Sequence, residues 1–257
     1  MPSQLRSPDG TVSQGAIEAF ASVFVEEPLR GRGYAGEMMR GVIEQTLPEG
    51  MHAYILYSEV GEKIYNAVGF RARPAFEHIL TALPPSDLLA RADTLTRPAL
   101  EALWRDMPPP APPAGGGGAL RVRPTFEQLS WHLLRQDLYA RFLGRPVPDL
   151  CGARGPGGAF VVWCANYREG ALVVHHLRAA GAADLAALLA VAREYAGALG
   201  LARVVAWEEE ECGPAAWADA APDSRRRPRD DCIPMIRPAA PGLDPDGWAV
   251  ISRSIWV

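Results

Sequence analysis

Apolar residues occur at two different spacings along the first third of this chain. Continuous apolar runs, which are typical of strands buried on both faces, occupy Ala19–Val25, Met51–Tyr57 and the end of Phe70–Leu83. Apolar residues at helical spacing occupy Tyr34–Leu47, and a shorter helix is expected from Ser58 to Val68. This order of strand, helix, strand, helix and strand predicts an α/β (α+β) fold.

Turn-forming segments frame this first unit. Met1–Gln14 is polar and contains a Pro-Asp-Gly turn, so we expect an irregular start. Ser86–Met107 has the apolar spacing of a helix. Pro108–Gly118 (PPPAPPAGGGG) has the composition of a linker, stiff in its proline half and flexible in its glycine half. We therefore predict a first domain over residues 1–83, a helix and linker over 84–118, and a second α/β domain over 119–257.

The second unit repeats the mixture of strands and helices without a glycine-arginine turn. The charge runs Glu208–Glu211 and Arg225–Arg229 are predicted to be solvated loops. The predicted elements are a strand at Leu120–Val122, a helix at Thr125–Leu143, hairpin strands at Ala159–Ala165 and Ala171–Leu177, a helix at Ala183–Leu199, and strands at Arg203–Trp207 and Trp248–Val257.

Composition restricts the possible functions. A net charge of −4 argues against a broad nucleic-acid surface, and no apolar run reaches membrane-spanning length. Four scattered cysteines predict free buried thiols in a reducing compartment, hence a cytoplasmic protein. His175 and His176 are adjacent on a predicted strand and therefore face opposite sides, so no metal site is expected.

A basic glycine-rich turn, Arg30-Gly31-Arg32-Gly33, follows the first predicted strand and leads into a helix. The free N–H groups of a helix N-terminus and the helix dipole favour an anion. Glycine allows close approach of the backbone to a phosphate, and arginine adds charge-assisted hydrogen bonds. The turn predicts a site for a phosphate-bearing cofactor.

Two interpretations of this turn are open. Gly31-x-Gly33-x-x-Gly36 satisfies the dinucleotide fingerprint, and Glu59 stands where a ribose-binding acid would lie, which favours an NAD(P)-dependent oxidoreductase. However, five residues separate the strand from the first glycine, and no further α/β repeats follow. The other interpretation is an R-x-x-G-x-A pattern carried by Arg30, Gly33 and Ala35.

This second pattern, with Tyr65-Asn66-Ala67-Val68-Gly69-Phe70 after the next strand, resembles the GCN5-related N-acetyltransferase (GNAT) superfamily. The resemblance implies that acetyl-CoA is the co-substrate and that Tyr65 is the general acid that protonates the leaving thiolate. Glu18 is a weaker candidate for the general base. The implied cofactor-binding residues are Val23, Phe24 and Val25 beside the pantetheine arm, and Arg30, Gly31, Arg32, Gly33, Tyr34 and Ala35 around the pyrophosphate.

Longer stretches are similar to the fungal lysine N6-acetyltransferase family of lysine catabolism. They are Ser22–Met39, Ile55–Tyr65, Pro124–His132, Gly152–Arg154, Phe160–Trp163 and Val204–Trp207. This resemblance implies a small-molecule amine as the acceptor, with the N6-amine of free L-lysine as the best candidate. It implies no nucleic-acid or membrane partner, and it leaves the oligomeric state open.

The superfamily normally has about three strands and two helices before its cofactor strand, whereas some fifteen residues precede that strand here. We therefore expect a GNAT-like fold that is truncated at its N-terminus, followed by a second GNAT-like domain. A truncated, non-catalytic CoA-binding protein is the alternative to an enzyme.

Overall fold

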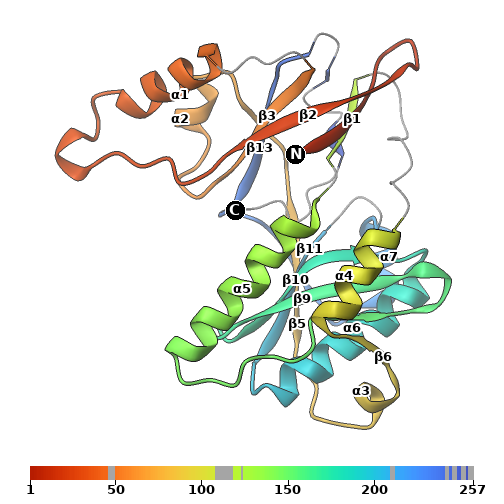
Figure 1. Ribbon diagram of the computed structural model, residues 1–257. Helices are drawn as coiled ribbons and strands as arrows, with labels where there is room; N and C mark the ends of the chain where they lie inside the picture. The colour runs from red at the N-terminus through yellow and green to blue at the C-terminus, as the bar shows by residue number, and fades with distance from the viewer. Residues whose placement is uncertain are drawn as a thin grey trace.

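A computed structural model describes residues 1–45, 50–107, 118–122, 124–208, 212–240, 243–244, 248–249 and 253. Their strands form two seven-stranded sheets, one in the upper and one in the lower half of Figure 1. The mixed α/β class predicted from the sequence is confirmed.

The first sheet is mainly antiparallel and has helices on one face. Buried side chains of α1, such as Met39 and Ile43, pack on alternate residues of the central strand, including Tyr54 and Leu56. The strand order is β14 (Trp248–Ala249), β7 (Ala119–Val122), β1 (Pro2–Arg6), β2 (Val12–Phe20), β3 (Met51–Ser58), β13 (Ile233–Pro238) and β4 (Arg71–Ala72). The helices are η1 (Glu27–Leu29), α1 (Tyr34–Gln45) and α2 (Lys63–Asn66).

The second sheet is covered by helices on both faces. Along its strand Phe160–Asn166, Val161 and Trp163 pack towards α6, whereas Phe160 and Val162 pack towards α4 and α5, as the period of two requires. The strand order is β12 (Arg225–Pro228), β5 (Phe76–Thr81), β11 (Arg203–Trp207), β10 (Ala171–Arg178), β9 (Phe160–Asn166), β8 (Gly152–Arg154) and β6 (Asp93–Leu95). The helices are α3 (Leu88–Arg91), α4 (Arg97–Asp106), α5 (Phe126–Phe142), η2 (Pro156–Gly158), α6 (Ala182–Ala198) and α7 (Pro214–Ala220).

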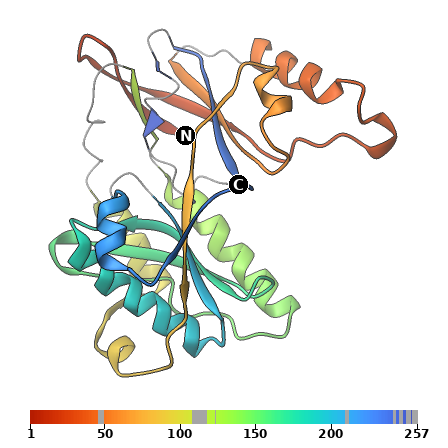
Figure 2. The same cartoon turned by 180° about the vertical axis from the view of Figure 1, so that it is seen from behind.

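The chain crosses between the two sheets several times. β5 precedes residue 83 but pairs with β11 and β12 of the second sheet. β7 and β13 follow residue 118 but pair with β1 and β3 of the first sheet. Figure 2 shows β5 running down into the lower half of the molecule. The expected divisions at residues 83 and 118 therefore do not coincide with the limits of the sheets.

An aromatic and cationic contact joins the two sheets. Tyr57 of β3 and Trp207 of β11 have ring centroids 5.6 Å apart. The buried guanidinium of Arg229 lies 3.3 Å from the centroid of the Trp207 ring, and burial lowers the pKa of Arg229 to about 10. Arg229 is thus part of the packing between the sheets.

Many predicted elements of the second unit are confirmed, and the strand Arg203–Trp207 has the expected bounds. Thr125 forms a capping box with Gln128 at the start of α5, which fixes where this helix begins. The predicted hairpin is β9 and β10, and the helix predicted at Ala183–Leu199 is α6. Most of Pro108–Gly118 and of Trp248–Val257 lies outside the described residues.

Several predictions of secondary structure are wrong. Met1–Gln14 contains β1 and the start of β2, because its residues pair with each other and with β7. Ser86–Met107 is broken into α3, β6 and α4, because Asp93–Leu95 pairs with β8. Phe70–Leu83 holds two strands that belong to different sheets. Arg225–Pro228 is a strand, β12, because β5 offers it a free edge.

The short helix after β3 also differs from its predicted length. Only Lys63–Asn66 is helical, and Gly69 follows with a φ of +90°. In α1, Met38 and Val42 are exposed, although they share the helical spacing of the buried Met39 and Ile43.

All four cysteines are free and buried, as predicted. Within the described residues, no group of three or more His, Cys, Asp or Glu side chains converges in a metal-binding arrangement. No helix in this part of the chain is long and apolar enough to span a bilayer.

Candidate functional site

A cleft of about 550 Å³ opens where β2 and β3 separate. These strands run parallel, and the last residue pair in their register is Phe20 opposite Leu56. Beyond Phe20 the chain leaves the sheet, while β3 continues to Ser58. The cleft is lined by residues 19–23 after β2, by Leu56, Tyr57, Glu59, Val60 and Tyr65 around the end of β3, and by Trp131, Arg135 and Tyr139 of α5.

The aromatic residue at the end of β2 anchors the point of separation. The ring of Phe20 packs against Tyr54 and Phe70, with centroids 5.8 and 6.0 Å away. Two residues further on, Ser22 has a φ of +54°, a left-handed conformation that turns the chain out of the strand direction. Residues 21–26 are therefore not a continuation of β2.

The expectation that Val23, Phe24 and Val25 belong to a buried strand is wrong. Among the described residues, no strand pairs with their backbone, and 67% of Phe24 is exposed. Of these three residues, Val23 alone lines the cleft. An apolar run was not sufficient to predict burial, because burial also requires a partner strand.

The glycine-arginine turn has the local geometry that its sequence suggested. Gly31 and Gly33 have φ values of +76° and +84°, and a Cβ atom at either residue would meet no neighbour within 4 Å. The turn follows η1, in which Pro28 occupies the first turn. Arg30 closes it, because its Nε donates to the carbonyl oxygen of Val25 at 3.0 Å.

The turn ends at the N-terminus of α1. The first bond of the helical ladder runs from the Glu37 amide to the Gly33 carbonyl, at 3.1 Å. The amides of Tyr34, Ala35 and Gly36 thus precede the ladder, as at every helix start. Arg30–Tyr34 are exposed and Ala35 is partly buried, and none of them lines the cleft. The cleft and the turn are thus separate features, connected along the chain by residues 24–29.

Tyr65, the predicted general acid, forms part of the cleft wall. It belongs to α2, is 8% exposed, and packs edge-on against Phe70 with centroids 6.4 Å apart. Burial, with a smaller contribution from the negative charge of Glu59, raises the pKa of Tyr65 above its usual value. The phenol therefore stays protonated at neutral pH and can donate a proton or a hydrogen bond.

Glu18, the weaker candidate for a general base, is not brought to this site. It is exposed on β2, opposite Tyr54 in the strand register, and does not line the cleft. Glu59 is the carboxylate that does line it. Of the predicted cofactor-binding and catalytic residues, only Val23 and Tyr65 reach the cleft.

Sequence reasoning missed the third wall of the cleft. Trp131, Arg135 and Tyr139 project from α5, some seventy residues beyond Tyr65. Their spacing of four residues places them on one side of a helix, and this was the available signal. Only the tertiary structure brings that side of α5 to the end of β3.

The dinucleotide interpretation of the glycine turn is not supported by the sheet around it. That interpretation requires an open, mostly parallel, doubly wound sheet. Among the described strands of the first sheet, only the pairs β2–β3 and β14–β7 are parallel. The turn matches the sequence pattern G-x-G-x-x-G, but the sheet beside it is not of the doubly wound type.

Comparison with known proteins assigns the chain to a family. The family model of the LYC1 GNAT-like C-terminal domain matches residues 91–252, more than half of the chain, and the chain belongs to this family. The matched segment contains α5 and the second sheet except β5. The turn at residues 30–35 and Tyr65 precede it. No curated protein matches the sequence.

Several solved structures match the chain at low sequence identity. A GCN5-related N-acetyltransferase from Kribbella flavida has a TM-score of 0.49 and 18% identity over 92% of this chain and 55% of its own. Eis1 from Mycobacterium abscessus has a TM-score of 0.47 and 15% identity over 93% and 60%. A probable N-acyltransferase from Enterococcus faecalis has a TM-score of 0.48 and 11% identity over 93% and 57%. The chain thus spans 55–60% of the length of these structures.

Proposed function

We propose that this protein is an acetyl-CoA-dependent N-acetyltransferase that acts on the amine of a small molecule. The observation that carries the proposal is the cleft between the diverging ends of β2 and β3, with the protonated phenol of Tyr65 in its wall. Membership in a GNAT-like family agrees with it. Following the sequence resemblance, the N6-amine of free L-lysine is the proposed acceptor.

The proposed chemistry uses three groups of residues. Arg32 and the amides of residues 33–35 would hold the pyrophosphate of acetyl-CoA, and Val23 would flank the pantetheine arm in the cleft. The neutral amine attacks the thioester carbonyl, the new C–N bond forms, and the C–S bond breaks. Tyr65 donates its proton to the departing thiolate, the amine releases a proton to solvent, and Tyr65 regains a proton from solvent.

The test of this function is release of free thiol from acetyl-CoA with a panel of amino acids and polyamines. We expect release with at least one acceptor, together with a mass increase of one acetyl group on that acceptor. Tight CoA binding without release for any acceptor would favour the non-catalytic CoA-binding alternative. Thermal stabilisation by NAD(P) but not by CoA would contradict both.

Replacing Arg32 with glutamine should weaken CoA binding without changing stability. Arg32 is exposed and, among the described residues, makes no hydrogen bond or ion pair, so its guanidinium is available to a phosphate. A lost hydrogen bond to a charged group corresponds to about 10- to 100-fold in Kd. Isothermal titration should show this loss for CoA but not for pantetheine, which lacks the pyrophosphate. An equal loss for both ligands would remove Arg32 from the pyrophosphate site.

A further inference from the structure

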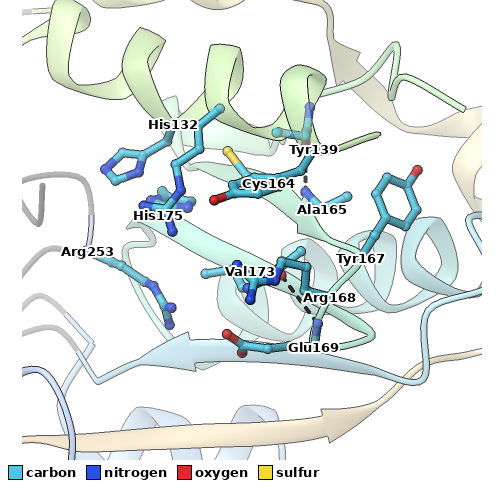
Figure 3. Close-up of a pocket in the computed structure, with 13 residues that line it drawn as sticks. His132, Tyr139, Cys164, Ala165, Tyr167, Arg168, Glu169, Val173, His175 and Arg253 are labelled. Carbon is cyan, nitrogen blue, oxygen red and sulfur yellow. Dashed lines mark hydrogen bonds between the residues drawn. The ribbon is translucent and has the colours of Figure 1, made fainter. Parts of the chain in front are cut away.

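A second cavity, of about 350 Å³, lies between α5 and the hairpin formed by β9 and β10. In Figure 3, His132 and Tyr139 extend into it from α5, and Arg253 enters from the opposite side. Residues 166–169, at the end of β9 and in the turn of the hairpin, also line it. This cavity lies within the segment that the family model matches.

Among the described residues that line this cavity, arginines outnumber carboxylates. The arginines are Arg135, Arg168 and Arg253, and the carboxylate is Glu169. Glu169 interacts electrostatically with Arg253 and so offsets part of one charge. His175 adds no positive charge. Burial is the main reason that its pKa lies well below the usual value, and the nearby cationic groups lower it further. The described part of the cavity thus offers several guanidinium groups to an anionic ligand.

Two of these guanidinium groups converge on one aromatic ring. The guanidinium carbons of Arg135 and Arg168 lie 5.9 and 5.6 Å from the centroid of the Tyr139 ring. Both distances are within the range in which a guanidinium group is attracted to an aromatic ring. A carboxylate matches the fork of donors that each arginine presents.

The cavity adjoins the cleft that holds Tyr65. Arg135 and Tyr139 line both hollows. A single small molecule could therefore place an amine in the cleft and an anionic group in the cavity. The turn at residues 30–35 borders neither hollow, so an anion at Arg135 is distinct from a phosphate at that turn.

We propose that this cavity is a carboxylate-binding subsite, in which Arg135 and Arg168 hold the carboxylate of an amino-acid acceptor whose amine reaches the cleft. The proposal rests on the proposed acetyltransferase function for the identity of the acceptor. It narrows the acceptor from any small amine to an amine that carries a carboxylate at its other end. Arg253 contributes positive charge from the opposite wall.

The test compares ligands that differ only in the carboxylate. L-Lysine, L-lysine amide and 1,5-diaminopentane are titrated into the full chain by isothermal calorimetry without acetyl-CoA, and CoA is titrated separately. The variants are Arg168→Gln, at an exposed turn where the fold tolerates change, and Arg135→Gln. Arg141→Gln is the matched control, because Arg141 is an exposed residue of the same helix that lines neither hollow.

We expect L-lysine to bind about 10- to 100-fold more tightly than the amide or the diamine, as for hydrogen bonds to a charged group. Arg168→Gln and Arg135→Gln should each weaken lysine binding by about 10-fold and leave diamine binding unchanged, whereas Arg141→Gln changes neither. Carboxylate-dependent binding without acetyl transfer would support the subsite and contradict the enzyme function.

Two results would overturn the subsite while the enzyme function stands. One is acetyl transfer with equal binding of lysine and diamine. The other is a loss of CoA affinity, rather than lysine affinity, in Arg168→Gln, which would mean that the cavity binds a phosphate of the cofactor.

Discussion

Replacing Tyr65 with phenylalanine is expected to lower the turnover number by about 10²- to 10⁴-fold, the range for a lost general acid. The substitution removes only the hydroxyl group of this cleft-lining residue and keeps the ring that packs on Phe70. Because the pKa of Tyr65 is raised, the wild-type phenol remains protonated through neutral and mildly alkaline pH. The residues proposed to hold the pyrophosphate are not changed, so we expect the same CoA affinity. The loss of activity should appear in kcat.

Tyr54 provides a matched control for this substitution. It lies in the same apolar cluster, donates a hydrogen bond to the carbonyl of Ile43 at 3.4 Å, and does not line the cleft. Tyr54→Phe should cost some stability and leave kcat within about twofold, because no group in the cleft changes. Steady-state kinetics at saturating acetyl-CoA would measure both variants. Equal kcat values for Tyr65→Phe and the wild type would remove Tyr65 from the mechanism.

Acidification from pH 7.5 to pH 5 is expected to destabilise the fold by several kcal/mol. Burial lowers the pKa values of His52, His78, His175 and His176, and that of His176 falls to about 4. Below pH 6.5 the unfolded chain takes up protons that the folded chain does not, so stability falls with pH. At pH 5, His176 alone accounts for about 2 kcal/mol. His175, whose pKa is well below normal, should contribute a comparable amount.

This loss is large against a total stability of about 5–15 kcal/mol. It should fall mainly between pH 6.5 and 4, before most carboxylates titrate. Urea denaturation followed by tryptophan fluorescence at pH 7.5, 6 and 5 would measure it. His176 lies 5.2 Å from the Trp104 ring and 5.4 Å from the Phe160 ring, so His176→Phe keeps an aromatic group there. That variant should lose about 2 kcal/mol less over this range, and an unchanged pH dependence would contradict the assignment.

Local signals predicted much of the second unit. A capping box defined the start of α5, glycine at residue 200 with a φ of +70° ended α6, and period-two burial defined β9 and β10. These elements depend on short stretches of chain, so their residues carried enough information. Ser86–Met107 was misread because β6 exists only through its pairing with β8, which is remote in the sequence.

For the site, sequence reasoning found single residues but not their arrangement. The glycine conformations at the turn and the position of Tyr65 near the end of β3 were predictable from local chemistry. The cleft itself was not, since it depends on where β2 stops pairing with β3. The wall formed by α5 and the adjoining cavity depend on packing between segments separated by more than sixty residues.

The sequence by itself determined the mixed α/β class, the turn with its two left-handed glycines, and most elements of the second unit, because backbone preference and apolar spacing act over a few residues. Only the tertiary structure decided that β5 belongs to the second sheet and that β7 and β13 belong to the first. It also decided that residues 23–25 leave their strand and that Arg135 borders both hollows. Those outcomes depend on which distant segments bury each other's surfaces, and no short stretch of chain encodes that choice.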